Sequence, residues 1–283
     1  MGIDIAQLRQ WVGRTEQVSD LITAVPVQAL AATLDLDNGP SLLDKPLRPC
    51  WHWLYFLPLH RQSLIGADGH PMRGGFLPPV PLPRRMWAGS QLSFEAPLRV
   101  GQAVSRTSRI GDVRLKEGRT GPLVFVQVHH EIRTGEQVCI RETHGIVYRG
   151  MPASDEVPAA GKPASNDVHW SRNITPDDVL LFRYSALTFN GHRIHYDRRY
   201  VTGVEGYPGL VVHGPLIATL LLDLLARAMP ATQVKGFAFK AMKPIFDTAP
   251  FQVRGRFDGD HTVHLWAVTP DGDTAMEATA HIA

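Results

Sequence analysis

The sequence predicts an α+β fold made of two similar halves, in which a helix packs against antiparallel strands that come late in each half. Four strand-like segments, rich in β-branched and aromatic residues, close each half of the chain. Residues 216–229 form one long apolar segment, as in a buried helix. Residues 97–102 resemble residues 244–249, and a strand-like segment follows each copy. The predicted units are an N-terminal half at 1–150, a linker at 151–172 and a C-terminal half at 173–283.

The first 60 residues predict a helix followed by a buried aromatic segment. Between residues 4 and 34, apolar residues recur at roughly helical spacing, with interruptions at Gly13 and Pro26. The Asp-Asn-Gly-Pro sequence at 37–40 predicts a turn. Residues 49–57 are aromatic and apolar, and periodicity does not separate a short buried helix from a buried strand there. The aromatic residues of this segment either form core or line a binding pocket; they are Trp51, Trp53, Tyr55 and Phe56.

A long loop precedes the first strands. Residues 66–83 are dense in Gly and Pro, and a loop of this length within a domain is often functional. It either covers a bound ligand or lies on the surface. The predicted strands that follow are 91–98, 103–110, 123–132 and 138–148. His129 and His130 are interpreted as a pair at a strand edge rather than as ligands. Residues 151–172 then carry prolines and no periodicity, which predicts the linker.

The second half centres on the apolar segment at 216–229. Gly214 and Pro215 suit a helix start, because Pro favours the first helical position, and Pro230 suits the end. The segment is apolar on nearly every side, so we expect the helix to be buried. The predicted strands that follow are 234–241, 251–257, 263–268 and 275–282.

The composition excludes several classes of function. The chain has 283 residues, with 29 Lys and Arg against 27 Asp and Glu, and the formal charge of +2 does not point to nucleic acid or to a membrane. No apolar run is long enough to span a membrane, and the polar N-terminal residues do not fit a signal peptide. The two cysteines, Cys50 and Cys139, lack metal-binding spacing, which favours a reducing cytoplasm over a disulfide framework.

Candidate functional residues gather between residues 182 and 216. The stretch F-N-G-H-R-I-H-Y-D supplies Asn190, His192 and His195, and G-L-V-V-H-G-P-L supplies His213 and Gly214 directly before the apolar helix. The first N–H groups of a helix have no partner within it and carry the positive end of its dipole, so they can stabilise an oxyanion. A histidine nearby can move a proton at neutral pH.

These two motifs resemble those of the MaoC-like, R-specific enoyl-CoA hydratases, which are hot-dog proteins. That family carries D-x-N-P-x-H and then an H-G element at the start of the hot-dog helix. Here Asn190 stands at the Asp position, His195 at the His position, and His213 with Gly214 at the H-G element. The resemblance covers the second half well and the first half loosely, which implies a double hot-dog fold with a degenerate first repeat.

The resemblance also implies roles for three residues. His195 would be the acid/base, Asn190 would orient the water, and Gly214 would bind the thioester oxygen. The resemblance implies neither a metal nor a redox cofactor, and coenzyme A enters as part of the acyl-CoA substrate. A homodimer is expected by analogy with the family.

The Asn at the Asp position is typical of a subgroup. An amide cannot take up a proton, so His195 works either alone or with an acid from Tyr196, Asp197 or Glu205. The Asn190 form resembles the type 2 hydroxyacyl-thioester dehydratases and the mesaconyl-C4-CoA and itaconyl-CoA hydratases. This implies a hydro-lyase that adds water to an α,β-unsaturated acyl-CoA and gives citramalyl-CoA. The alternative is a 3-hydroxyacyl-thioester dehydratase of fatty acyl metabolism.

Arginines near the motif are candidates for binding the free carboxylate of such a substrate. The planar guanidinium group can bond both carboxylate oxygens, and Arg193 is the first choice. The alternative is that these arginines pair with neighbouring acids or reach the phosphates of CoA. The predicted substrate-binding residues are His192, His213, Arg183, Arg193 and Arg198.

Four other functions could use the same region. A metal site is not predicted, because H-E-x-x-H spacing and a cysteine pair are both missing. Ser185 and His195 could form a hydrolase pair, but no G-x-S-x-G elbow is present. A hot-dog thioesterase would use Asp197 or Glu205. A non-catalytic acyl-CoA-binding module is favoured by Asn190 and opposed by His195.

Overall fold

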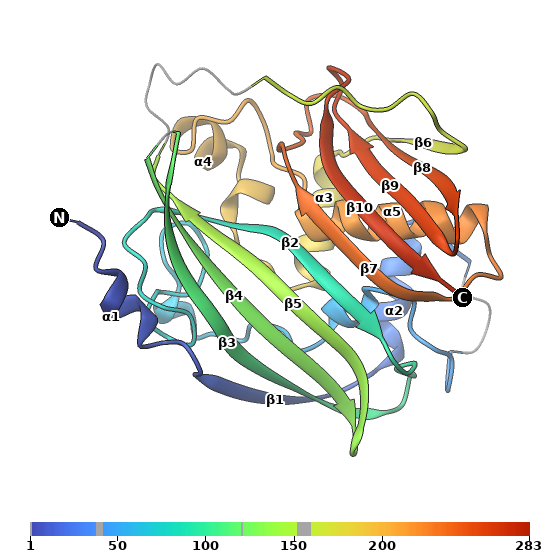
Figure 1. Ribbon diagram of the computed structural model, residues 1–283, viewed down its shortest axis with the longest axis horizontal. Helices are drawn as coiled ribbons and strands as arrows, with labels where there is room; N and C mark the ends of the chain where they lie inside the picture. The colour runs from blue at the N-terminus through green and yellow to red at the C-terminus, as the bar shows by residue number, and fades with distance from the viewer. Residues whose placement is uncertain (1, 38–41, 120, 152–159) are drawn as a thin grey trace.

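The computed structural model describes residues 2–37, 42–119, 121–151 and 160–283. Ten strands in these ranges form one antiparallel sheet (Figure 1). The first half contributes β1 (Thr15–Leu21), β2 (Arg84–Phe94), β3 (Ala103–Gly118), β4 (Gly121–Thr134) and β5 (Gln137–Arg149). The second half contributes β6 (Trp170–Ile174), β7 (Val234–Ala241), β8 (Phe251–Gly259), β9 (Thr262–Val268) and β10 (Thr274–Ile282). The α-helices are α1 (Ile5–Arg9), α2 (Ala24–Thr33), α3 (Asp178–Leu187), α4 (Arg198–Gly203) and α5 (Gly214–Ala228).

The sheet repeats its own pattern about its centre. Its order is β1-β3-β4-β5-β2 in the first half and β7-β10-β9-β8-β6 in the second, and the halves join where β2 pairs with β7. In each half, two successive amides after the central strand donate to one carbonyl oxygen. These are Glu95 and Ala96 with Cys139, and Met242 and Lys243 with Ala275. The repeat seen between residues 97–102 and 244–249 is therefore present in the backbone, and the predicted α+β class is confirmed.

The predicted buried helix is α5. All residues from 216 to 225 are buried, and the helix packs against β8, β9 and β10 (Figure 1). A helix that is apolar on every side needs such cover to remove its surface from water. Its buried acid, Asp223, accepts hydrogen bonds from Arg172 and, at 2.8 Å, from Arg227, so the charge is compensated.

The prediction of helix from residue 4 to residue 34 is wrong in its middle, where the chain forms β1. β1 is an edge strand with mostly exposed side chains, so its apolar spacing carries little information. Its position is fixed instead by the backbone ladder with β3. Gly13, with φ of +87°, separates α1 from β1. Pro26 does not interrupt α2, because it lies in the first turn, where the missing N–H has no intrahelical partner.

Two further boundaries differ from the prediction, and the structure of the aromatic segment, which the sequence left open, is defined. The aromatic segment at 49–57 contains one 3-10 turn, η1 (Trp51–Leu54). β2 begins at Arg84 rather than at residue 91, and β6 begins inside the predicted linker. The remaining predicted features, residues 152–159 of the linker and 38–40 of the turn, lie outside the described part of the chain.

The two halves differ in the segment that comes before their late strands. The second half places α5 there, whereas residues 55–83 of the first half contain one short 3-10 turn, η2 (Gln62–Leu64), and no long helix. Many residues of this loop line a large cavity. Trp51 lies in the core, Tyr55 and Phe56 belong to the core and also line the cavity, and Trp53 lines the cavity. The missing long helix therefore leaves room for a binding site.

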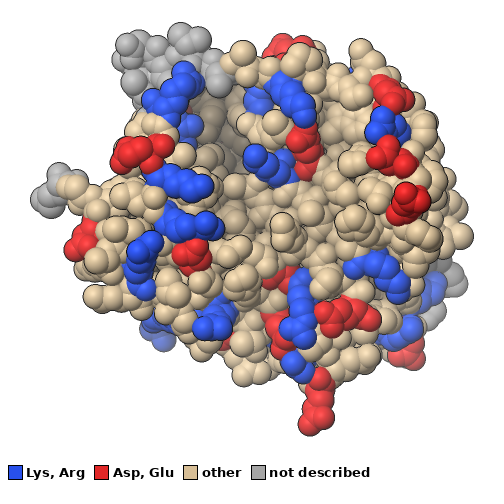
Figure 2. All heavy atoms as spheres, viewed as in Figure 1, with Lys and Arg blue, Asp and Glu red and all other residues tan. Residues whose placement is uncertain are grey.

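Positive and negative side chains are mixed on the face of the molecule shown in Figure 2. Lys and Arg are interspersed there with Asp and Glu, in agreement with the formal charge of +2. Among the described helices, none combines the length and the apolar character needed to cross a membrane.

Candidate active site

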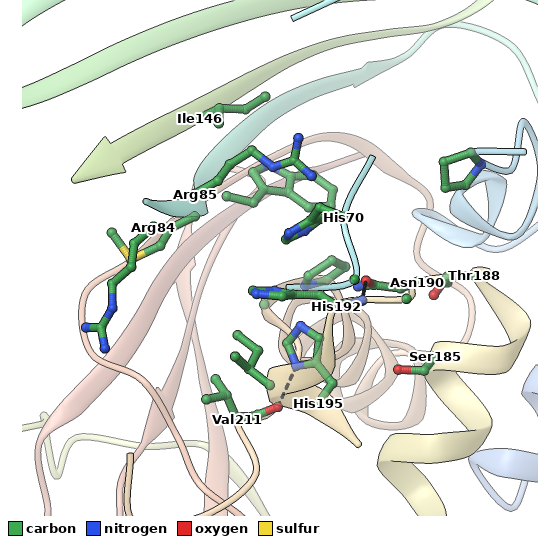
Figure 3. Close-up of a pocket in the computed structure, with 18 of the residues that line it drawn as sticks. His70, Arg84, Arg85, Ile146, Ser185, Thr188, Asn190, His192, His195 and Val211 are labelled. Atoms are coloured by element: carbon green, nitrogen blue, oxygen red, sulfur yellow. Dashed lines mark hydrogen bonds between the residues drawn. The ribbon is translucent and has the colours of Figure 1, made fainter. Parts of the chain in front are cut away.

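One cavity of about 2360 Å³ contains most of the predicted site residues. Its walls come from both halves of the chain, from the first-half loop and from the motif before α5. Figure 3 shows three histidines gathered at one place on this wall: His70, His192 and His195.

His195 is a neutral imidazole with a defined tautomer. The ring is buried in the 3-10 turn η3 (Arg193–His195), with 8% of the residue exposed. Nδ1 lies 2.6 Å from the Val211 carbonyl oxygen (dashed in Figure 3), and a carbonyl only accepts, so Nδ1 carries the hydrogen and Nε2 is free. Burial lowers the pKa of His195 to about 4, although the Val211 contact opposes this change.

His213 supports His195 from behind the cavity wall. The two rings stack with centroids 3.7 Å apart, and His213 Nε2 lies 2.8 Å from Ser185 Oγ. His213 is fully buried and does not line the cavity, so the predicted substrate contact of His213 is corrected to a supporting position. Within the described chain, Ser185 bonds to His213 and not to His195, so the hydrolase pair is not formed.

The start of α5 faces the same cavity. Gly214 is the first residue of the helix and lines the cavity wall. Its N–H has no partner within the helix, and the next residue, Pro215, has no N–H. An added Cβ at Gly214 would have no neighbour closer than 4.0 Å, so the space beside it is open. One amide at the positive end of the helix dipole is therefore available to an oxygen in the cavity.

Asn190 lies on the cavity wall just after α3. Its side-chain Oδ1 accepts a hydrogen bond from the backbone N–H of His192 at 3.0 Å. The backbone N–H of Asn190 donates to the Ser185 carbonyl oxygen at 2.8 Å. Nδ2 has no hydrogen-bond partner among the described residues, so it is the group that Asn190 offers to a ligand. The role of Asn190 in placing water stays a prediction.

The first-half loop brings a further histidine, His70, to the site. The His70 and His192 ring centroids lie 3.9 Å apart, and His192 lies 5.5 Å from His195. Asp68 Oδ2 is 3.2 Å from Nδ1 of His70. Burial would raise the pKa of Asp68, but hydrogen bonds from His70 hold it below its usual value. Sequence reasoning identifies the loop but not these two residues, because nothing in their spacing connects them to the motif.

A close backbone contact holds this loop on the motif. Gly69 has φ of +86°, and a Cβ there would lie 1.8 Å from the Gly191 carbonyl oxygen. The Arg193 amide donates to the Asp68 carbonyl at 2.9 Å, and Arg193 Nη1 donates to the Ala67 carbonyl at 3.0 Å. The two halves of the chain thus build one site.

The predicted arginines do not offer a free guanidinium group to the cavity. Arg193 bonds to Asp197 Oδ2 through Nε at 2.9 Å and Nη2 at 2.7 Å. Arg198 pairs with Asp247 at 2.5 Å. Arg183 is exposed, and neither it nor Arg198 lines the cavity. Arg193 lines the cavity but its guanidinium group is paired with Asp197, whereas Arg183 and Arg198 lie outside the lining, so a carboxylate-binding role for these arginines stays a prediction.

Two other arginines, at the start of β2, do line the cavity. Arg84 Nε is bound to Glu205 at 2.9 Å. Arg85 is hydrogen-bonded to Tyr148 and forms no ion pair with a carboxylate of the described residues. Burial and the charge of Arg85 both lower the pKa of His70, and Figure 3 shows the Arg85 guanidinium beside that ring. Arg85 is therefore a cation beside the site histidines that can meet an anion in the cavity.

The acids considered as partners of His195 are engaged elsewhere. Asp197 bonds to Arg193 and does not line the cavity, and Glu205 bonds to Arg84. The Tyr196 hydroxyl donates to a backbone carbonyl at 2.9 Å. The thioesterase alternative therefore lacks a free carboxylate at these positions, and Asp68 is the carboxylate beside the site histidines.

A second buried polar cluster lies on the first-half wall. The Glu142 carboxylate accepts from His52, Trp53 and His144 at 2.6–3.2 Å, and His144 continues to His130 at 3.2 Å. Burial would raise the pKa of Glu142, but the neighbouring histidines hold it well below its usual value. The interpretation of His130 as a strand-edge residue is corrected, because its side chain lines the cavity.

Acid is expected to destabilise the fold, because several histidines are buried in the neutral form. Burial lowers the pKa of His130, His192, His195 and His213. An unfolded histidine takes up its proton near pH 6.5, so the free energy of unfolding falls as the pH falls from there toward about 4. His195 alone accounts for a loss of about 2 kcal/mol in the free energy of unfolding at about pH 5.

Urea unfolding at about pH 7.5 and at about pH 5 measures this loss of unfolding free energy. A His195→Gln variant with an undiminished loss would contradict this assignment.

Comparison with known proteins agrees with this site. Residues 50–247 match the family model described as hydroxyacyl-thioester dehydratase type 2. The chain is 49% identical to the mesaconyl-C(4)-CoA hydratase of Chloroflexus aurantiacus, over 96% of each protein. It is 27% identical to the mitochondrial hydroxyacyl-thioester dehydratase type 2 of Schizosaccharomyces pombe, over 83% of this chain and 88% of that protein.

A solved structure shares the fold. The MaoC-like dehydratase from Phytophthora capsici matches with a TM-score of 0.70 at 12% identity, over 99% of this chain and 98% of that one. The predicted double hot-dog fold is confirmed. With the family model matching residues 50–247 and a relative 49% identical over 96% of its length, the chain belongs to the hydroxyacyl-thioester dehydratase type 2 family.

Proposed function

We propose that this protein is a hydro-lyase that adds water to the double bond of mesaconyl-C4-CoA and gives citramalyl-CoA. The observation that carries the proposal is that a neutral histidine base, His195, and the amide of Gly214 share one cavity. Hydration of an enoyl thioester needs a base for the water and a donor for the oxygen on which negative charge develops. The similarity to mesaconyl-C(4)-CoA hydratase supports the choice of substrate.

The proposed reaction proceeds by conjugate addition. The water oxygen bonds to the β-carbon, and Nε2 of His195 takes one water proton. The double-bond electrons move toward the thioester carbonyl, and the enolate oxygen accepts a hydrogen bond from the Gly214 N–H. The α-carbon then gains a proton, so the product contains one water more than the substrate. The net reaction is neither an oxidation nor a reduction, and coenzyme A stays attached throughout.

The free carboxylate of the mesaconyl group lies on the carbon that receives the hydroxyl group. Its binding partner must therefore lie near the base. Arg85 lines the cavity beside His70 and has no carboxylate partner among the described residues. We assign carboxylate binding to Arg85 in place of Arg193, because a guanidinium group can bond both oxygens.

Arg85→Gln tests this assignment. The variant is expected to lower kcat/KM for mesaconyl-C4-CoA by about 10- to 100-fold, the value of a charge-assisted hydrogen bond. Crotonyl-CoA has no second carboxylate, so its hydration should change far less. The control is Arg109→Gln, which removes an exposed arginine of β3 outside the cavity. Equal losses on both substrates would refute the carboxylate role.

Dehydration of a longer 3-hydroxyacyl thioester is a second candidate, because it is the same chemistry in reverse. The large cavity with the aromatic wall residues Trp53, Trp87 and Phe56 favours it. Turnover of a series of acyl-CoA substrates of increasing length distinguishes the two functions. The homodimer and the cytoplasmic location stay predictions, and sedimentation of the purified protein tests the first.

A further inference from the structure

We propose that His70, backed by Asp68, is a second proton-transfer residue and donates the proton that the α-carbon gains. This inference rests on the proposed function, hydration of an enoyl thioester. Besides His195, the motif offers no group to donate the proton of the α-carbon. Asn190 is an amide, and Asp197 and Glu205 are paired with arginines. The first-half loop supplies the missing group.

The two histidines differ in the partner of Nδ1. Nδ1 of His195 donates to the neutral Val211 carbonyl at 2.6 Å, whereas Nδ1 of His70 donates to the Asp68 carboxylate at 3.2 Å. Both rings therefore keep Nε2 for proton exchange. A carboxylate stabilises an imidazolium ion more than a carbonyl does, so His70 holds a proton more readily. This difference assigns the base to His195 and the acid to His70.

The charged and titratable groups around His70 come from three elements. They are Asp68 and Arg73 in its own loop, Arg85 in β2, and His192 and His195 in the motif. Burial and the two arginines lower the pKa of His70, and Asp68 opposes them. An enolate in the cavity adds a negative charge, which favours the protonated ring when the proton is needed.

The proton balance closes over one turnover. His195 Nε2 gains a proton from water as the carbon–oxygen bond forms at the β-carbon. His70 Nε2–H then loses its proton as the carbon–hydrogen bond forms at the α-carbon. Transfer of a proton from His195 to His70 restores both residues. His192 lies between them, with ring centroids 5.5 Å from His195 and 3.9 Å from His70.

A metal ion is the other ligand that this cluster could suit. Ligand atoms of Asp68, His70 and His192 lie within 4.8 Å of one another. Proton transfer is favoured because Nδ1 of His70 is already bonded to the Asp68 carboxylate. Dialysis against a chelator should leave the rate unchanged. A loss of rate that Zn²⁺ restores would overturn the proposal.

His70→Gln is expected to lower kcat by at least about 100-fold, the usual size of an acid–base contribution, with little change in KM. The pH profile separates this role from a structural one. In the wild type, kcat/KM should fall on the alkaline side as His70 loses its proton, and this limb should lie below the ordinary histidine pKa because burial lowers the pKa of His70. Asp68→Asn removes the charge that holds this proton, so the alkaline limb should move by about one unit to lower pH.

The matched control is His281→Gln, because His281 is exposed on β10 and does not line the cavity. Its rate should equal that of the wild type. If His70→Gln fails to fold, the Asp68→Asn profile still decides. A normal rate in His70→Gln, or an unmoved alkaline limb in Asp68→Asn, overturns the role of His70 while the hydratase activity stands. A wild-type protein that hydrates no enoyl thioester refutes the proposed function itself.

Discussion

Replacing His195 by alanine is expected to lower kcat for water addition by at least about 100-fold. The ring is held by Val211 so that the unprotonated Nε2 is free, and Asn190 cannot take its place as a base. The loss of absorbance of the enoyl thioester gives the initial rates. Because the base acts in the transition state, kcat should fall more than KM rises.

A second substitution separates chemistry from packing at this position. His195 stacks on His213, so alanine also removes a buried contact. Glutamine keeps most of the volume but cannot act as the base, so His195→Gln should be as slow as His195→Ala with a thermal midpoint nearer the wild type. A near-normal rate in either variant would show that another group removes the proton.

Gly69→Ala is expected to separate the first-half loop from the motif and to lower kcat by at least about tenfold, because His70 and Asp68 move with the loop. The new Cβ would lie 1.8 Å from the Gly191 carbonyl oxygen, so the backbone of one of the two segments must move to remove the clash. The positive φ of +86° adds a strain of roughly 1–3 kcal/mol.

The same loop offers a control for this strain. Gly74 has φ of +89°, but a Cβ there would meet nothing nearer than Pro79 Cβ at 3.7 Å. Gly74→Ala therefore carries the backbone strain without the clash, and its rate should stay close to the wild type. Kinetics and thermal unfolding of both variants make the comparison. Equal losses in the two would mean that loop docking on Gly191 does not support the reaction.

Much of the fold could be predicted because its signals are local. The helix α5 is apolar throughout, and the strands of both halves carry β-branched and aromatic residues. β1 could not be predicted in this way, because an exposed edge strand has no buried face to leave a pattern, and its partner β3 lies far along the chain. The residue 4–34 segment therefore resembled one helix although it forms two helices and a strand.

In the candidate site, too, residues of a local motif could be predicted, and residues placed by contacts between distant segments could not. His195 and Gly214 lie near each other in the sequence and precede a recognisable helix, so the motif indicates both. His70 and Arg85 reach the cavity from the other half, and their position depends on the contact of Gly69 with Gly191. Arg193 looked suitable as a carboxylate ligand because a pattern of residue types does not show that Asp197 already binds it.

The most direct test of water addition is incubation of the purified protein with mesaconyl-C4-CoA beside crotonyl-CoA, followed by mass spectrometry of the thioesters. The account predicts that mesaconyl-C4-CoA gains the mass of one water, at a rate that His195→Gln lowers by at least about 100-fold. Turnover of crotonyl-CoA alone would indicate that the substrate is a fatty acyl thioester. No mass gain with either thioester would contradict the central claim.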